Sequence, residues 1–258
     1  MEWIEWLLSR EFRTFIFDHN LFFPLLFLVR LVGFTTAELI RPARRVIYRS
    51  VVLNDFTAFL VYQYVVYPLA GAIDWYIAIR PDFPAAVFAM PLAVRVCCYF
   101  AVADLGHYWI HRLMHTKPMW RIHKWHHAPT YMYWFAGVRA TVPDHALVVL
   151  PYAFAGSLLG LAPWWIDLAI GVAHAVKNDW MHMNVTWRSN WLEWFVVTPR
   201  YHHIHHSDKP EHYMANLAVF FTIWDRLFGT YVDPDTVTQP LSFGIGEQVP
   251  LARLVAGV

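Results

Sequence analysis

Long hydrophobic stretches alternate with shorter polar stretches along most of the chain. A helix needs about 20 predominantly apolar residues to cross a bilayer. Five stretches approach that length, namely residues 20–40, 51–73, 93–112, 145–161 and 163–181. The last two are short, and we expect them to tilt or to pair as a hairpin. The pattern predicts an all-α integral membrane protein with about four or five spans.

The opening segment MEWIEWLLSREFRTFIFDHN differs from these stretches because charged residues interrupt it. Arg10, Arg13 and Asp18 occur before its apolar run is complete, and no small-residue cleavage site follows. A secretory signal peptide has an uninterrupted apolar core and such a site. We therefore expect an amphipathic helix that lies in the membrane interface.

Lys and Arg residues indicate the orientation of the spans, because cytoplasmic loops are enriched in them. If the segment RPARRVIYR (41–49) is cytoplasmic, alternation of the spans brings residues 113–144 and everything after about residue 177 to the same side. Most of the 20 Lys and Arg residues then lie on that side. Arg95 would be costly in the middle of the bilayer. We expect the third span to begin near Arg95 and to reach the inner face close to His111.

These expectations describe one compact unit, residues 1–258, with a membrane stem and a cytoplasmic cap. The N-terminal spans lie in residues 1–112, and residues 145–181 form a membrane hairpin. The cap is made from residues 113–143 and 182–235, and residues 236–258 form a tail.

Composition agrees with a membrane protein, since 58% of the residues are hydrophobic and 15% are charged. A net charge of +1 without a basic run excludes a nucleic-acid-binding protein. Cys97 and Cys98 are adjacent in an apolar run, where a disulfide would be strained and the spacing of a metal site is absent. Both cysteines are predicted to be packing residues.

Histidine is concentrated in one part of the chain, and four of the 15 histidines occur in YHHIHH (201–206). Residues three or four apart share one face of a helix. Three clusters have that spacing, with His111 and His115 in HRLMH, His123, His126 and His127 in HKWHH, and His202, His205 and His206 in YHHIHH. The segment NDWMHMN adds His182, with Asn178 one turn earlier. The predicted topology brings all of them to the inner membrane face.

Neutral imidazole is the commonest metal ligand in proteins, and this many histidines exceed what one four- or six-coordinate ion can use. The clusters predict two metal ions. Spacing does not choose the metal, because imidazole suits zinc, copper, iron and nickel. The sequence has no HExxH, GxSxG or GxxxxGK motif. A structural helix-end histidine is the alternative for any single pair, and a membrane metal transporter or metal-binding protein is the alternative for the whole set.

The chain resembles the fatty acid hydroxylase superfamily, also called the sterol desaturase family, in the segments DLGHYWIHRLMH, WRIHKWHH, MHMNVTWRSNWLEWFVVTPRYHHIHHSDKP and NLAVFFTIWDRLFGTYVDP. The resemblance covers about residues 104–234 and includes all histidine clusters in order. It implies a transmembrane stem and a cytoplasmic cap with two iron ions, which zinc can replace in a purified sample. It also implies that dioxygen is activated against an unactivated C–H bond of a lipid.

Carried over by position, the resemblance makes nine residues the metal ligands: His111, His115, His123, His126, His127, His182, His202, His205 and His206. Several members have a histidine where this chain has Asn178. That residue is expected either to hydrogen-bond a ligand or to leave one metal with an open position. His107 stands where tyrosine is usual, and His203 is an extra within the last cluster. Both are expected to be structural or to contact a ligand.

Several other polar residues have two readings. Asp104 lies two helical turns before His111 and either accepts the free N–H of a liganding imidazole or is an interfacial aspartate. Asp225 and Arg226 either pair to close the cap or form a solvated helix end, and the structural role is favoured. His174 is expected to be a packed polar residue. Three further histidines have no neighbouring feature that indicates a site: His19, His145 and His212.

The function implied by the resemblance is oxygen-dependent hydroxylation of a fatty acyl, sterol or related lipid, and desaturation on the same site is the alternative. A non-catalytic homologue that binds lipid also stays open. The sequence shows no haem or iron–sulfur module, so we expect a separate electron donor, a ferredoxin or a b-type cytochrome with its reductase. The compact size and the absence of a retrieval signal favour a bacterial inner membrane, with the metal site on its cytoplasmic side.

Overall fold

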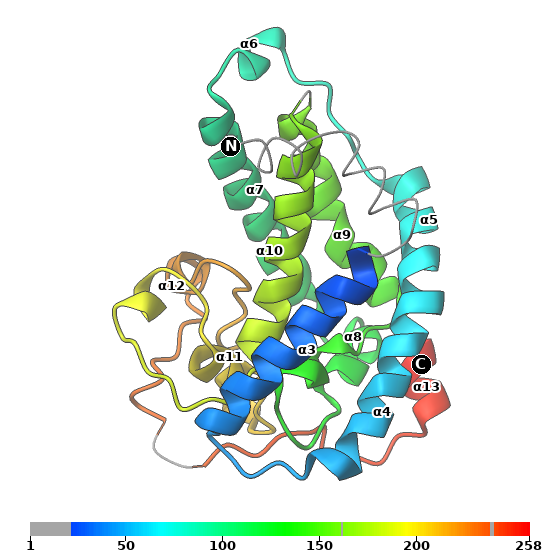
Figure 1. The fold of residues 1–258 in the computed structure, drawn as a ribbon, viewed down its shortest axis with the longest axis vertical. Helices are drawn as coiled ribbons and strands as arrows, with labels where there is room; N and C mark the ends of the chain where they lie inside the picture. Colours follow the sequence, from blue (N-terminus) through cyan, green and yellow to red (C-terminus); the bar gives the residue numbers. More distant parts are fainter. Residues whose placement is uncertain (1–21, 161, 238–239) are drawn as a thin grey trace.

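The computed structural model describes residues 22–160, 162–237 and 240–258 (Figure 1). Five long helical stretches lie close to the predicted positions: α3 (Phe22–Ile40), α4 (Tyr48–Val61) continued by the π-helical η1 (Tyr62–Val66) and α5 (Tyr67–Ile77), α7 (Leu92–Met114), α9 (Val142–Gly156) with η3 (Ser157–Leu159), and α10 (Trp164–His182). The described residues contain isolated β-bridges but no β-strand. The all-α prediction is confirmed, whereas the predicted interfacial helix and His19 lie outside the described residues.

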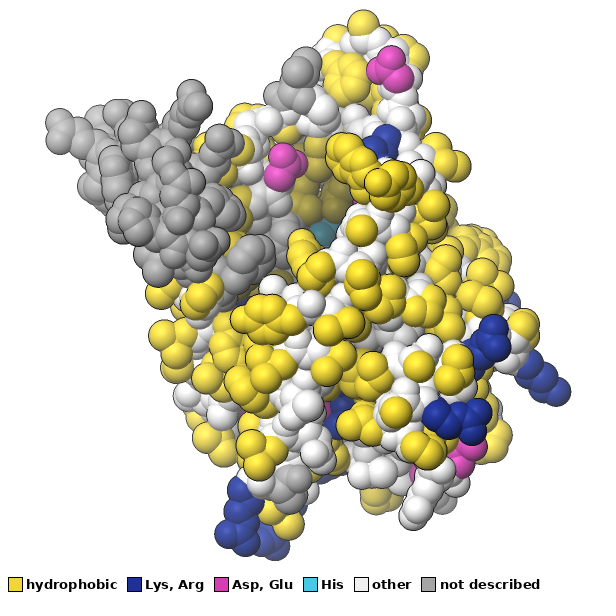
Figure 2. Space-filling model, turned by 90° about the vertical axis from the view of Figure 1, so that its right-hand side faces the viewer, with side chains coloured by type: hydrophobic (Ala, Val, Ile, Leu, Met, Phe, Trp, Pro, Cys, Tyr) yellow, Lys and Arg dark blue, Asp and Glu magenta, His cyan; other side chains and the backbone are white. Residues whose placement is uncertain are grey.

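The long helices carry the apolar surface that a membrane protein needs. Two stretches, Val51–Ile77 and Val142–Leu159, are long and apolar enough to cross a membrane. Large side chains such as Val29, Leu53 and Tyr76 are exposed on α3, α4 and α5, and hydrophobic side chains cover much of the face in Figure 2. Soluble monomers rarely expose apolar areas of this extent. The membrane stem is supported, while the count of four or five spans stays a prediction.

The stem is closely packed where α7 meets α9. Gly106 of α7 lies against Pro151 of α9, and a Cβ atom at Gly106 would come within 2.6 Å of the Cβ of Pro151. Glycine at this position therefore allows the two helices to approach. Arg95 is buried near the other end of α7, where its guanidinium donates to the carbonyl oxygens of Leu158 and Gly160. Both bonds come from one terminal nitrogen, and they satisfy part of a cation that would otherwise be costly among apolar side chains.

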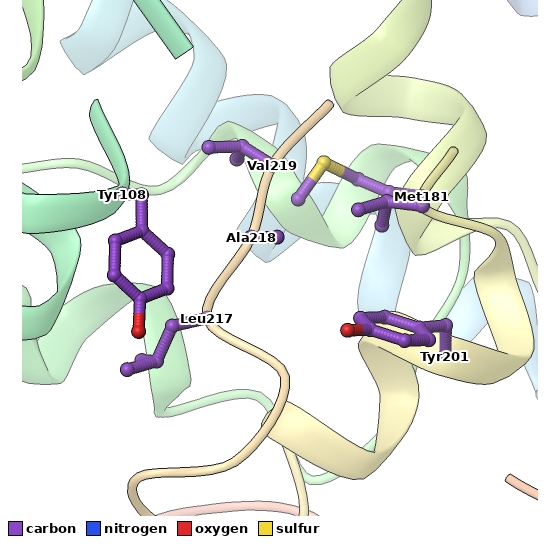
Figure 3. Close-up of a cluster of buried hydrophobic side chains, with 7 residues drawn as sticks. Tyr108, Met181, Tyr201, Leu217, Ala218 and Val219 are labelled. Atoms are coloured by element: carbon purple, nitrogen blue, oxygen red, sulfur yellow. The ribbon is translucent and has the colours of Figure 1, made fainter. Parts of the chain in front are cut away.

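Short helices gather at one end of the stem, opposite to α6 (Ala85–Phe88): α8 (Trp120–His127), η2 (Trp134–Val138), η4 (Leu192–Trp194), α11 (Pro199–His205), η5 (Pro210–His212) and α12 (Ile223–Phe228). Their core includes an extended segment, Leu217 to Val219. Figure 3 shows this segment between Tyr108 of α7 on one side and Met181 and Tyr201 on the other. The packing joins α7, α10 and α11 at the end of the stem.

The C-terminal residues return to α8. Leu254 of α13 (Leu251–Ala256) packs with Trp125 of α8 and Ala58 of α4. Glu247 forms an ion pair with Lys124, which is also in α8, and its Oε1 lies 2.7 Å from the lysine Nζ. The short helix α8, which carries three predicted ligands, is therefore packed against α4 and the C-terminal residues.

Candidate metal centre

The ends of four helices bring all nine predicted ligands together. The histidines lie near the C-terminal ends of α7, α8, α10 and α11, and they form two groups in which the ligand atoms lie within 4.8 Å of one another. The five-histidine group consists of His111, His115, His123, His127 and His205. The four-histidine group consists of His126, His182, His202 and His206.

In the five-histidine group, every Nε2 atom is buried and has no hydrogen-bond partner among the described residues. The Nδ1 of His111 lies 2.7 Å from the carbonyl oxygen of Leu217, and the Nδ1 of His205 lies 3.0 Å from that of Ala215. A carbonyl can only accept, so Nδ1 carries the hydrogen and Nε2 presents a lone pair. A buried polar atom without a partner costs about 1–3 kcal/mol. Five such nitrogen atoms that converge on one point are the donor set of a cation site.

The four-histidine group is even tighter. The Nε2 atom of His182 lies 3.2 Å from that of His206 and 3.3 Å from that of His202, and the last two are 2.9 Å apart. The Nδ1 of His182 donates to the carbonyl oxygen of Asn178 at 2.7 Å, which leaves Nε2 as a lone pair. Two nitrogen ligands about 2.1 Å from one metal ion and at right angles would lie about 3 Å apart. The spacing therefore fits ligands of a first-row metal.

Burial keeps the imidazoles in the form that binds metal. Desolvation lowers the pKa of His123 to about 3 and that of His126 to about 4. It also holds the pKa of His205 and His206 well below the ordinary value. Neutral imidazole is the ligating form, and an all-imidazole set suits iron, zinc, copper or nickel. Neither group, as far as the described residues show, includes a carboxylate, and both fit such an ion.

Asp144 is a partner that the sequence did not reveal. Its Oδ2 lies 2.9 Å from the Nδ1 of His123. In the sequence, Thr141 and Asp144 read as the start of a helix, and Thr141 does cap α9 by accepting from the Asp144 backbone N–H at 3.2 Å. The capping pattern conceals that the same aspartate turns its carboxylate to a ligand of α8.

Asp104 has other partners than the predicted imidazole. Its Oδ2 accepts from the backbone N–H of Phe221 and from the Nε1–H of Trp224, both at 2.8 Å. Neither reading of Asp225 and Arg226 describes the structure, because Asp225 is fully buried and hydrogen-bonded elsewhere. The guanidinium of Arg226 instead stacks on aromatic rings.

Asn178 lies outside both groups. Its backbone carbonyl accepts from His182, and its side-chain amide nitrogen lies 3.5 Å from the carbonyl oxygen of Gly137 in η2. Gly137 passes so close to His182 that a Cβ atom there would overlap the imidazole ring. This contact could not be predicted from the sequence, because WFAGV is an ordinary apolar run.

The remaining described histidines belong to neither group: His107, His145, His174, His203 and His212. One of them contacts a ligand residue as expected, since the Nε2 of His203 lies 3.3 Å from the backbone carbonyl oxygen of His182. His203 Nδ1 lies 3.0 Å from a guanidinium nitrogen of Arg44. Within the stem, His107 bonds to the Tyr152 hydroxyl at 2.6 Å, and His174 bonds to the Tyr99 hydroxyl at 3.0 Å.

Apolar space adjoins the helices that carry the ligands. A cavity of about 460 Å³ is lined by Ile77, Val102, Leu105, Ile110, Leu150 and Phe154, from α5, α7 and α9. Its size lies within the range of about 300–1,000 Å³ for small-molecule pockets. Figure 2 shows a hollow on one face of the molecule, with hydrophobic, acidic and basic side chains around it and a histidine visible inside. The surroundings suit an apolar ligand.

Comparison with known proteins gives one family. The sequence profile described as "Fatty acid hydroxylase" matches residues 96–230. The alkylglycerol monooxygenase of Danio rerio is 28% identical over 57% of this chain and 33% of its own length. The ornithine lipid hydroxylase OlsE of Rhizobium tropici is 30% identical over 68% of this chain and 57% of its own length.

A third relative, a Delta(7)-sterol 5(6)-desaturase of Aspergillus fumigatus, is 28% identical over 58% of this chain and 52% of its own length. The chain thus matches about a third to just over half of the length of these relatives. No solved structure matches the chain.

Proposed function

The chain belongs to the fatty acid hydroxylase family, and from this membership we propose that it is an oxygen-dependent enzyme that hydroxylates a C–H bond of a membrane lipid. The observation that carries the proposal is the pair of histidine groups, in which nine imidazoles converge in a buried space beside apolar surroundings. A membrane-embedded oxidoreductase needs such a site at the edge of an apolar phase. A single structural zinc ion needs only four ligands, so one such ion does not account for nine histidines.

We propose that the five-histidine group and the four-histidine group each hold one iron ion. When bound, iron supplies the activation of dioxygen towards an unactivated C–H bond. The chain's own residues keep the ligands neutral through burial, and they fix the ring orientations through Leu217, Ala215 and Asp144. Zinc would bind the same imidazoles without redox activity.

The substrate class follows from the relatives and from the apolar cavity. The relatives are named for an alkylglycerol, an ornithine lipid and a sterol, and all three are lipids. The cavity near α5, α7 and α9 is lined by hydrocarbon side chains. We propose that a lipid enters sideways from the bilayer and that apolar contacts orient one carbon towards the metal centre.

We further propose that the helical stem crosses a bacterial inner membrane and that the histidines face the cytoplasm. The distribution of Lys and Arg along the sequence supports this orientation. Electrons would come from a separate ferredoxin or b-type cytochrome with its reductase, which can reach a cytoplasmic site.

The test compares the intact protein with His205→Ala and with His212→Ala in matched lipid-producing cells supplied with heavy-isotope dioxygen. His205 belongs to the five-histidine group, whereas His212 belongs to neither group. We expect one lipid class to gain a single heavy oxygen in the intact protein and in His212→Ala, and not in His205→Ala. Loss of two hydrogens without oxygen would identify a desaturase. Unchanged lipids, with electron donors present, would contradict lipid oxidation.

A further inference from the structure

We propose that Asp225 is a positioning residue of the five-histidine group. It anchors a loop whose backbone carbonyls orient two of the ligands, and it joins that loop to the helices that carry them. The inference rests on the proposed metal centre and deepens it, because it assigns a task to the segment IWDRLFGT that the histidine clusters do not explain.

The carboxylate of Asp225 is saturated with donors. Its Oδ1 accepts from the backbone N–H of Leu217 at 2.8 Å and from the hydroxyl of Thr230 at 2.6 Å. Its Oδ2 accepts from the backbone N–H of Ala218 at 2.8 Å and from the hydroxyl of Tyr201 at 2.8 Å. The residue is fully buried. Each carboxylate oxygen of Asp225 accepts two hydrogen bonds. Only an ionised carboxylate offers acceptors on both oxygens without a proton of its own.

The anchored segment, residues 215–218, is the carbonyl loop. The carbonyl of Leu217 accepts from His111, and the carbonyl of Ala215 accepts from His205, so one short loop orients ligands from α7 and from α11. Asn216, between the two carbonyls, has a φ of 51°, which is unusual for a residue other than glycine. Its side-chain amide donates to the backbone carbonyls of Tyr201 and Val232 and accepts from the backbone N–H of Val232. These bonds hold the loop in this conformation.

Asp225 is also linked to two of the four helices that carry ligands, α11 and α7. Tyr201 lies one turn before His205 in α11 and donates directly to the carboxylate. Thr230 donates to Asp225 and lies 2.8 Å from the hydroxyl of Tyr108, which is three residues before His111 in α7. The loop and both helices are therefore registered against one buried anion.

The effect should be larger for the five-histidine group. The helix α11 carries ligands of both groups, but the acceptors known for the four-histidine group lie elsewhere. His182 donates to Asn178 within its own helix, and His126 Nδ1 lies 3.1 Å from the carbonyl oxygen of Arg139. Neither acceptor belongs to the carbonyl loop. A purely structural role for Asp225 would weaken both groups alike, whereas a positioning role weakens mainly the five-histidine group.

The test is a titration of the full-length, metal-free protein in detergent with cobalt(II), followed by optical absorption. His111→Ala and His182→Ala identify the spectral component of each group. In Asp225→Asn the amide must turn an N–H₂ group towards two of the four donors. We expect the affinity of the five-histidine component to fall by about 10–100-fold, as for other partners of metal ligands. The affinity of the four-histidine component should fall clearly less, because only its α11 ligands are linked to Asp225, through Tyr201.

Asp235→Asn is the matched control, because Asp235 forms ion pairs with Arg188 and Arg200 at the surface. It should leave both components unchanged. If Asp225→Asn does not fold, Thr230→Val carries the test, since it removes one donor to the carboxylate and the link to Tyr108. Equal weakening of both components, or no weakening, would overturn the inference. A wild-type protein that fails to bind two cobalt ions would instead contradict the proposed metal centre.

Discussion

The Nδ1 atom of His123 lies 2.9 Å from a carboxylate oxygen of Asp144, so an acidic residue of α9 orients a histidine of α8. Both side chains are buried. Metal-bound histidines usually donate their second N–H to a carboxylate or a carbonyl. Here one apolar helix of the stem, α9, contributes the only carboxylate that the described hydrogen bonds give to a ligand of either group.

Asp144→Ala should lower metal affinity by about 10–100-fold, because it removes the acceptor that orients His123. Asp144→Asn should cost less, since its amide oxygen can still accept from Nδ1. The measurement is the metal-to-protein ratio after dialysis against increasing concentrations of chelator. Asp74→Asn, which disturbs an ion pair with Arg80 remote from the ligands in sequence, is the control. Equal metal retention in all variants would contradict a role for Asp144.

The metal-free protein should lose stability in acid. Burial holds the pKa of His126 at about 4, below its ordinary value of 6.5. Between these values the unfolded chain binds a proton that the folded chain excludes, so the free energy of unfolding falls as pH falls from about 6.5 to 4. Thermal unfolding of chelator-treated protein across this range measures the slope.

In His126→Asn, the free energy of unfolding should depend less steeply on pH than in the wild type. The unfolded variant no longer gains a proton at this position that the folded protein excludes. Carboxylates away from His126 contribute equally to both proteins and cancel in the comparison. Asp144 does not cancel, because the charge of His126 lowers its pKa, so the double variant His126→Asn/Asp144→Asn is compared with Asp144→Asn as well. Identical slopes would mean that His126 is protonated or exposed in the folded protein.

The sequence predicted which histidines lie together, because helical spacing and residue type suffice for that. His123, His126 and His127 share one face of a helix wherever that helix lies. The partners could not be predicted in the same way. His111 bonds to a backbone carbonyl 106 residues away in the chain, and a carbonyl has no residue signature. Asp144 was concealed by its second role in a helix cap.

The long helices were likewise predictable from apolar stretches of the right length. The stretch 51–73 predicted one continuous helix, but the sequence did not indicate the π-helical turn η1 (Tyr62–Val66) between α4 and α5. Nor did it indicate that the tail packs on α8, because Leu254 and Trp125 meet only through tertiary packing. Contacts between distant segments depend on shape, which periodicity does not contain.

Metal should stabilise the fold, since an ion that binds the native state and not the unfolded state adds about 2.7 kcal/mol at 100 times its dissociation constant. We expect chelation to lower the melting temperature and to abolish lipid oxidation. Iron(II) should restore both, whereas zinc should restore the melting temperature alone. The double variant His111→Ala/His182→Ala should not respond to either metal. Lipid oxidation by the zinc-loaded protein would contradict an iron-dependent reaction.

Gly137→Ala should damage the four-histidine group without altering a ligand. The added methyl group would overlap the ring of His182, which lies against the backbone of η2. Either the ring or the backbone must move, and overpacking of this kind typically costs about 1–3 kcal/mol. Cobalt(II) titration should show a weakened component for the four-histidine group and an intact component for the five-histidine group.

Gly171→Ala is the control for the added methyl group, because Gly171 lies in α10, the helix that ends at His182, and a Cβ atom there meets nothing within 4 Å. Alanine is the better helix former by roughly 0.5–1 kcal/mol, so this variant should be at least as stable as the wild type and bind both metals. If Gly137→Ala also retained both components, the close approach of η2 to His182 would not constrain the ligand. The four-histidine group would then owe its geometry to the ends of α8, α10 and α11 alone.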